Sequence, residues 1–196
     1  MQISRMILFA VCLLAVALPV CADGAVPERS TIPDSEYVPN RYGVGLLLGG
    51  AYDPDPIGLV LVQGQMLVDY DRFSWHAAPE ALSLKFEANA GITTDGRDRA
   101  LLSVNALAHY YLGRRKAEKW VPYIEAGIGL IYTDFKVEGQ GLRFNFNPQA
   151  GAGVEFALPE DRAMTVSLRL HHVSNGNTYK DNRGFNSAFL MIGYLF

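Results

Sequence analysis

The sequence predicts an all-β fold, an eight-stranded antiparallel transmembrane β-barrel of the outer membrane. Segments of about ten residues, in which polar and apolar side chains alternate, recur throughout residues 41–196. No uninterrupted apolar run in that range reaches the length of a transmembrane helix. An export signal precedes these segments. The three observations together favour a chain that crosses a membrane with strands rather than helices.

The composition indicates one domain that is apolar for a soluble protein. The chain has 196 residues, 49% of them hydrophobic, a formal net charge of -3 and a mean hydropathy of +0.08. A nucleic-acid-binding protein would carry a cationic excess, which this sequence lacks. We therefore expect no nucleic-acid partner.

Residues 1–22 are expected to be a signal peptide. They begin with the positive Arg5, continue with an apolar run too short for a comfortable membrane span, and end with small residues at a cleavage site. Acylation of Cys21 is the less favoured alternative, because Pro19 and Val20 fit a lipobox poorly. Cys12 and Cys21 are the two cysteines of the sequence, so the predicted mature chain has no thiol and no disulfide. Residues 23–40 contain three prolines and are expected to form an extended periplasmic leader.

Each strand of the predicted barrel is read from period-two alternation, in which one face is apolar and the other is polar or glycine-rich. Leu59 and Leu61 weaken the alternation at the start of the second segment. Pro148 interrupts the sixth and must lie at a bulge or where no ladder bond is needed. The eight segments span residues 42–49, 59–70, 82–93, 102–112, 123–133, 144–156, 164–174 and 186–196.

The alternation assigns side chains to the two faces of the barrel. Leu168, Leu170, Leu190 and Ile192 are predicted to face lipid. The interior of an eight-stranded barrel is narrow enough for side chains to fill it. The charged side chains on the inward face should therefore form a lattice rather than a pore, and they are Lys85, Glu87, Glu125, Glu155 and Arg169.

The seventh segment ends with a histidine and a serine on its apolar face. His172 and Ser174 lie two residues apart, so their side chains share a face, with Cβ atoms roughly 7 Å apart. A histidine at that spacing can act as the base that a serine nucleophile requires. A soluble sandwich could also contain such a strand. In the barrel interpretation both side chains face the bilayer at the outer end of the strand.

A third group must hold the imidazole of such a pair. Asn186 lies on the outward face of the last segment, near the same end, because only residues 176–185 separate the two strands. Asn175 and Gly176 follow the serine and offer side-chain and backbone donors, which an oxyanion hole requires. The sequence therefore predicts a His172, Ser174 and Asn186 constellation.

The same stretch resembles the PagL-type lipid A 3-O-deacylases, a family of eight-stranded outer-membrane barrels. The resemblance rests on His172-Val173-Ser174-Asn175 and on Asn182-Arg183-Gly184-Phe185-Asn186-Ser187. It implies that the histidine is the base, that the serine is the nucleophile, and that Asn175 and Asn182 help to build the oxyanion hole. The implied reaction is hydrolysis of the ester at the 3-position of lipid A, with release of a 3-hydroxy fatty acid.

Asn186 occupies the position at which that family carries a glutamate. An amide can accept the imidazole N–H but brings no charge to stabilise an imidazolium, and the corresponding change in serine proteases costs about 10⁴ in turnover. Three outcomes stay open: a hydrolase oriented by Asn186, a site in which Asp181 of the loop reaches His172, and an inactive relative. We favour the first.

The predicted partners are the lipid A or lipopolysaccharide substrate, outer-membrane lipid, and the barrel-assembly machinery. The alternating apolar residues that end at Phe196 resemble the C-terminal signal that this machinery recognises. The sequence allows a homodimer. We expect no cofactor and no metal. A non-catalytic structural or adhesive outer-membrane barrel is the alternative, and a soluble lipid-binding barrel is third because the outward rows are apolar.

Overall fold

The computed structural model describes residues 40–70, 78–97, 99–113 and 118–196. The predicted signal peptide, residues 1–22, lies outside the described residues. So does the predicted leader, residues 23–40, except for Asn40. The first strand begins at Arg41.

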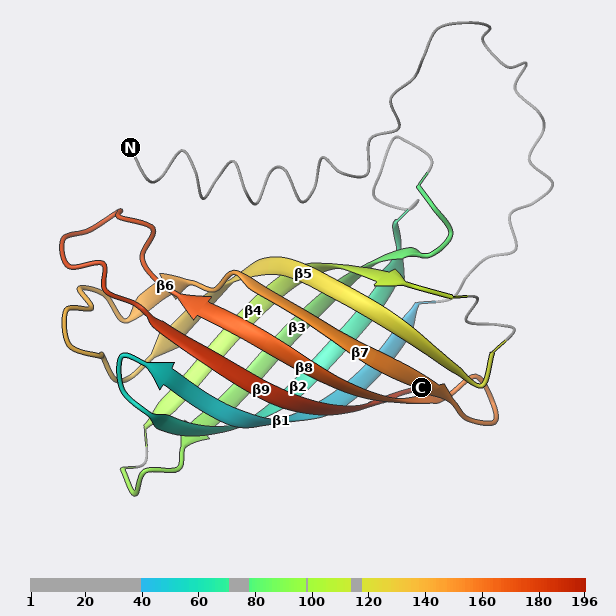
Figure 1. The fold of residues 1–196 in the computed structure, drawn as a ribbon, viewed down its shortest axis with the longest axis horizontal. Coiled ribbons are helices and arrows are strands. Elements are labelled where there is room, and N and C mark those ends of the chain that lie inside the picture. The colour runs from blue at the N-terminus through green and yellow to red at the C-terminus, as the bar shows by residue number, and fades with distance from the viewer. Residues whose placement is uncertain (1–39, 71–77, 98, 114–117) are drawn as a thin grey trace, which may run out of the picture.

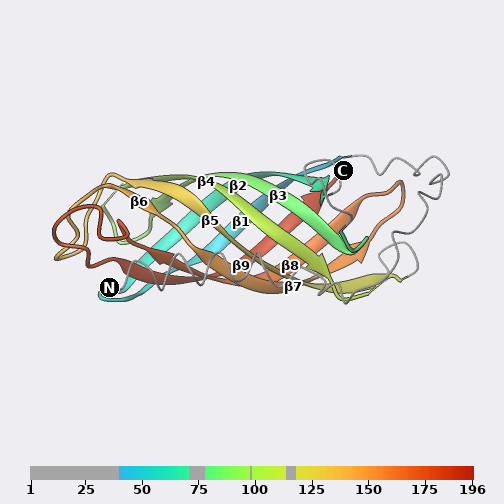
Figure 2. The same ribbon diagram turned by 90° about the horizontal axis from the view of Figure 1, so that it is seen from above.

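Antiparallel strands wind around a single axis and close into a barrel (Figures 1 and 2). Neighbours along the chain pair with each other, β1 pairs with β9, and the β4–β5 pairing closes the ring. The strands are β1 (Arg41–Asp53), β2 (Ile57–Asp69), β3 (Leu82–Thr93), β4 (Ala100–Tyr111), β5 (Trp120–Thr133), β6 (Phe144–Phe146), β7 (Gln149–Ala157), β8 (Ala163–Val173) and β9 (Phe185–Leu195). No helix of the described residues is long and apolar enough to cross a membrane.

The nine strand segments make an eight-stranded barrel because β6 and β7 form one interrupted strand. Both pair with β5 in the same register, Phe146 opposite Leu130 and Gln149 opposite Gly127. Pro148 causes the interruption, since proline has no N–H for the ladder. Its carbonyl still accepts a bond from the His172 N–H at 2.9 Å. The predicted fold class and the expected position of Pro148 are both confirmed.

Exposure alternates along the strands as the period-two pattern predicts. On β8, the Leu168 side chain is 68% exposed, whereas the next residue, Arg169, is 1% exposed. Leu170, Leu190 and Ile192 also point outward, and Glu125 and Glu155 are buried inside the barrel. The outer surface is therefore apolar over the strands, as lipid contact requires.

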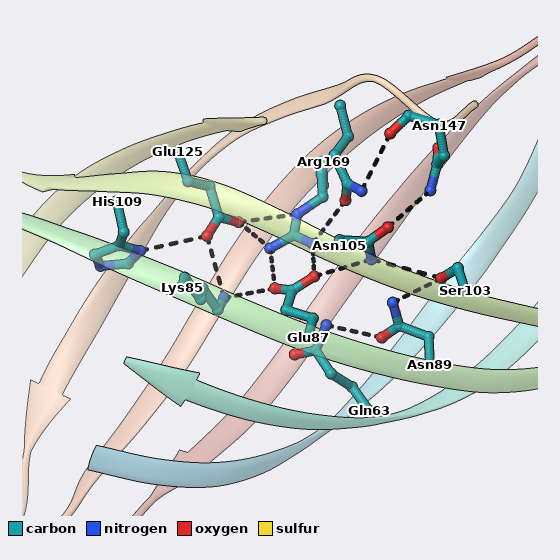
Figure 3. A network of polar contacts seen from close by, with 11 residues as sticks. Gln63, Lys85, Glu87, Asn89, Ser103, Asn105, His109, Glu125, Asn147 and Arg169 are labelled. Carbon is teal, nitrogen blue, oxygen red and sulfur yellow. Dashed lines mark hydrogen bonds and ion pairs between the residues drawn. The ribbon is translucent and has the colours of Figure 1, made fainter. Parts of the chain in front are cut away.

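A network of charged and amide side chains fills the middle of the barrel (Figure 3). Arg169 lies at its centre, donating to Glu87 at 2.7 and 2.8 Å and to Glu125 at 2.9 Å. Lys85 lies 3.0 Å from Glu87 and 3.1 Å from Glu125, so two cations face two carboxylates. Four of the five predicted members of the charged lattice thus contact one another, whereas Glu155 pairs with Arg41 at 2.9 Å. Pairing of this kind is what allows charges to be buried.

The interior changes character toward one end of the barrel, here called the loop end, which carries residues 54–56, 94–97, 99, 134–143 and 174–184. Apolar side chains replace charges there, and include Leu47, Leu59, Leu61, Leu101, Ile131, Phe135, Val137, Val173, Phe185, Phe189 and Met191. Leu59 and Leu61, which weakened the alternation, thus face inward. The interior at the loop end is thus packed with apolar side chains, as in the core of a soluble protein.

Candidate active site

β8 ends and β9 begins at the loop end of the barrel (Figure 1). The residues predicted to be catalytic lie at this end. His172 and Asn186 are direct cross-strand partners. Both belong to the outward-facing rows of their strands, in line with Leu170 and Ala188. Directly opposed side chains on one face lie about 5 Å apart at Cβ, which is close enough for a hydrogen bond.

A hydrogen bond joins this pair. The Nδ1 atom of His172 lies 2.7 Å from the Oδ1 atom of Asn186. An amide oxygen can only accept, so the imidazole proton must sit on Nδ1. The Nε2 atom then keeps its lone pair and is free to act as a base.

The amide nitrogen of Asn186 makes a second contact, to a carboxylate that sequence reasoning missed. Its Nδ2 atom donates to the Oδ2 atom of Asp53 on β1 at 2.8 Å. Asp181, the loop residue considered from sequence, is exposed, with a left-handed backbone (φ 57°). Asp53 is therefore the carboxylate that hydrogen bonds link to the histidine, through Asn186.

A bulge in β1 explains why the sequence pattern did not reveal Asp53. Gly50 pairs with Ala188 and Ala51 with Ser187, but Asp53 pairs with Asn186, so Tyr52 is an extra residue. Odd-numbered residues of β1, such as Leu47, point inward. The bulge brings odd-numbered Asp53 onto the outward face beside Asn186. Period-two alternation predicts the opposite face.

Ser174 follows the last residue of β8 and is held by β6. It exchanges two backbone bonds with Phe146, at 2.8 and 3.1 Å, so it stays in register with the outward row of β8. Its side chain is nevertheless only 3% exposed, while His172 is half-buried. Exposure of Ser174 to the bilayer, as expected from sequence, is therefore wrong. Among the described residues, no hydrogen bond joins the Ser174 hydroxyl to the His172 ring.

Gly184 packs directly against the serine. A Cβ atom added at residue 184 would lie 1.7 Å from the Val173 carbonyl oxygen and 3.1 Å from the Ser174 Cβ. The absence of a side chain thus lets the β8–β9 loop cover Ser174. This glycine also falls within the motif that carries the sequence resemblance.

Replacing Gly184 with alanine should displace Ser174 and lower turnover by about 100-fold, because a shift of about 1 Å at a reacting group is that costly. Gly64→Ala is the matched control, since a Cβ there meets nothing within 4 Å. Hydrolysis rates of both purified variants, with heat-modifiable gel mobility as the folding check, provide the measurement. Full activity of folded Gly184→Ala would show that the position of Ser174 does not depend on this contact.

Three asparagines organise the loop after the serine. The backbone N–H of Asn175 donates to Asn182 Oδ1 at 2.7 Å, and Asn182 Nδ2 donates to Asn177 Oδ1 at 2.8 Å. The Asn177 N–H donates to Asn175 Oδ1 at 2.9 Å. The Asn175 Nδ2 atom, by contrast, is buried and has no hydrogen-bond partner among the described residues. A buried donor without a partner is costly unless a ligand satisfies it.

Gly176 lies at the turn within this loop. Its φ is 63°, in the left-handed region that glycine adopts without strain. A Cβ there would lie 3.4 Å from the Phe146 ring. The turn thus closes over β6 beside the serine, with Asn175 and Gly176 placed next to it in the chain.

An apolar groove lies on the outer surface over β7, β8 and β9. Its small residues come from β7 and β9, and are Ala150, Gly151, Ala152 and Ala188. Leucines on β8 and β9 form its sides, namely Leu168, Leu170 and Leu190. Ala188 pairs with Leu170, one outward position below the His172–Asn186 pair. Small side chains between large ones leave room for an extended apolar ligand.

Within residues 40–70, 78–97, 99–113 and 118–196, no three His, Cys, Asp or Glu side chains group in a way that could hold an ion. The site offers the groups of acyl-transfer chemistry instead: a hydroxyl, a histidine whose Nε2 is free, and amide donors.

Comparisons with known proteins identify the family. A family model for lipid A 3-O-deacylase (PagL) matches residues 60–195. No curated protein matches the chain. The crystal structure of the outer membrane enzyme PagL is 23% identical with a TM-score of 0.56, covering 77% of this chain and 97% of that one. Neisserial surface protein A is 14% identical with a TM-score of 0.57, covering 80% of this chain and 94% of that one.

The two solved structures show the fold, and the family model shows the relationship. Both align with this chain over nearly their whole length, which agrees with the closed barrel seen here. The model match covers well over half of the sequence and includes every predicted site residue. The chain is therefore an outer-membrane β-barrel that belongs to the lipid A 3-O-deacylase (PagL) family.

Proposed function

We propose that the protein is a serine esterase that removes the ester-linked 3-position acyl chain of lipid A. The observation that carries the proposal is the 2.7 Å contact between His172 Nδ1 and Asn186 Oδ1, on the outward face beside Ser174. This contact leaves Nε2 as the free base. Membership of the deacylase family supports the substrate class.

The proposed first step is attack of the Ser174 hydroxyl oxygen on the ester carbonyl carbon. His172 Nε2 takes the hydroxyl proton as the new C–O bond forms, and the carbonyl oxygen becomes an oxyanion. We assign the Asn175 Nδ2 amide and the Gly176 N–H as donors to this oxyanion. The buried, unpartnered state of Asn175 Nδ2 supports that assignment.

Collapse of the tetrahedral intermediate breaks the ester bond. The sugar 3-hydroxyl leaves with the proton from His172, and the acyl group stays on Ser174 as an ester. A water molecule, deprotonated by His172, then attacks this ester; His172 returns the proton to the Ser174 oxygen as that bond breaks, and the 3-hydroxy fatty acid is released. Asn182 acts indirectly in this scheme, because its amide binds the Asn175 N–H and the Asn177 side chain.

The apolar groove supports an acyl substrate that approaches from lipid. It includes Leu170 and Ala188, which lie one outward position from the His172–Asn186 pair, so a chain lying in it would have its ester near the site. A lipid in the outer leaflet could reach the groove by sideways diffusion without leaving the membrane. Leu168, Leu170 and Leu190 would then pack against the chain.

The test is hydrolysis of defined lipid A by the purified barrel in detergent, followed by tandem mass spectrometry of both products. We expect loss of one 3-hydroxyacyl group from the 3-position and release of the free fatty acid. Ser174→Ala is the matched control and should release none. A diacyl phospholipid serves as the competing substrate.

Other outcomes would point elsewhere. Cleavage of the phospholipid alone would change the substrate class while keeping the esterase. A folded wild-type barrel that hydrolyses no ester would contradict the proposal and favour a non-catalytic barrel.

A further inference from the structure

The Asp53 side chain is unexplained by the fold and by the three-residue constellation. It lies at the end of β1, far in sequence from β8 and β9, yet its Oδ2 atom accepts a hydrogen bond from Asn186 Nδ2 at 2.8 Å. We propose that Asp53 is a positioning residue of the active site, acting on His172 through Asn186. The inference rests on the proposed esterase function for its effect on rate.

Hydrogen-bond chemistry gives the direction of this chain of contacts. An asparagine amide can present either its oxygen or its nitrogen to a neighbour, but a carboxylate can only accept. Asp53 therefore holds the Asn186 nitrogen toward itself and the Asn186 oxygen toward His172. The oxygen in turn holds the proton on Nδ1, which leaves Nε2 available to Ser174.

Charge is the second contribution of Asp53. When His172 takes the serine proton, the imidazolium needs a negative partner, which the neutral Asn186 cannot supply. A carboxylate hydrogen-bonded to the amide nitrogen polarises that amide and makes its oxygen a stronger acceptor. Asp53 thus supplies, at one remove, the charge that a glutamate at position 186 would have supplied directly.

The bulge in β1 is the independent observation that supports this role. Without the extra residue Tyr52, the register of Gly50 and Ala51 would place residue 52 opposite Asn186. The structure instead re-aims Asp53 onto the outward face at that point. Bulges recur beside active sites because they redirect one side chain in this way.

The kinetic test uses Asp53→Asn, with Asp55→Asn in the same turn as the matched control. Asp53→Asn lets the Asn186 amide rotate, so kcat should fall about 10- to 100-fold, as for other groups that orient a functional histidine. KM should change little, because the groove is untouched. Asp55→Asn should keep its activity, since Asp55 is exposed and outside the chain of contacts.

A second set of variants, built on Asn186→Glu, distinguishes a positioning role of Asp53 from a role in stabilising the pairing of β1 with β9. In Asn186→Glu, the new carboxylate accepts the His172 N–H directly and is repelled by Asp53. Adding Asp53→Asn to Asn186→Glu should then leave the rate unchanged or raise it. An equal loss in both backgrounds would overturn the proposal, because a purely structural role is indifferent to residue 186.

A measurement without substrate keeps the inference testable on its own. Nitrogen-15 NMR of histidine-labelled barrel in detergent reports which ring nitrogen of His172 carries the proton. The wild type should show the Nδ1–H tautomer, and Asp53→Asn should show a mixture. An unchanged tautomer in folded Asp53→Asn would overturn the inference. If the wild type is inert toward lipid A but Asp53→Asn still changes the tautomer, only the proposed reaction is contradicted.

Discussion

Ser174→Ala and His172→Ala should each lower the turnover of lipid A by about 10⁶-fold, as removal of either group does in other serine hydrolases. The double variant should be no slower than either single variant, because the two groups act as one unit. Release of 3-hydroxy fatty acid from purified protein is the measurement. Wild-type rates in either variant would exclude this nucleophile and base.

The neighbouring histidine provides the matched control for this prediction. His171 precedes His172 on β8 but points into the barrel, where its ring lies 4.8 Å from that of Phe189. His171→Gln should keep most of the activity, whereas His172→Gln should not. Loss of activity in both would indicate that the strand itself, rather than the outward imidazole, had been disturbed.

Arg169→Met should lower the free energy of unfolding by about 3–5 kcal/mol, because it leaves two buried carboxylates with one cation. Arg169 contacts both Glu87 and Glu125, and its side chain is fully buried. Urea unfolding in detergent or lipid, followed by heat-modifiable gel mobility, measures the change. Adding Glu87→Gln should recover part of the loss by removing one uncompensated charge.

An exposed arginine on the same barrel is the control for this second effect. Arg162 pairs with Glu160 near the turn between β7 and β8, where both side chains are open to solvent. Arg162→Met should cost at most about 1 kcal/mol, because surface ion pairs contribute little. Equal losses from Arg162→Met and Arg169→Met would contradict a central role for the buried network.

Period-two alternation is sufficient to predict this barrel and the pairing of its last two strands. It places His172 and Asn186 on one face, and a short connection brings them to one end; the observed register makes them direct partners. Alternation works here because lipid outside and a packed interior impose opposite demands on successive residues. The confirmed positions of Leu168 and Arg169 follow from the same rule.

Features that depend on a break in that rule were beyond sequence reasoning. Asp53 reaches the site only because Tyr52 is bulged, and a one-residue shift reverses every predicted side-chain direction beyond it. The burial of Ser174 depends on how the β8–β9 loop folds back, with Gly184 in contact. Neither a bulge nor a loop conformation leaves a periodic signal.

The contact with Asp53 changes the interpretation of the asparagine at position 186. The sequence alone suggested a site that lacks the acid of the triad. It left three outcomes open: a slow enzyme, an enzyme in which another carboxylate takes the place of the acid, and an inactive protein. The structure places a carboxylate next to the amide, with Asn186 between it and the histidine. We infer that Asp53 takes the role of the missing acid, and that it acts on His172 through Asn186 instead of contacting the ring directly.

Covalent capture of the nucleophile shows whether Ser174 is an activated serine. Purified wild-type barrel in detergent is treated with a fluorophosphonate, which reacts with activated serines, and the modified peptide is identified by mass spectrometry. We expect labelling at Ser174 and its loss in His172→Ala, with the folded barrel retained in both proteins. Labelling at another serine, or no labelling of the folded wild type, would exclude Ser174 as the nucleophile.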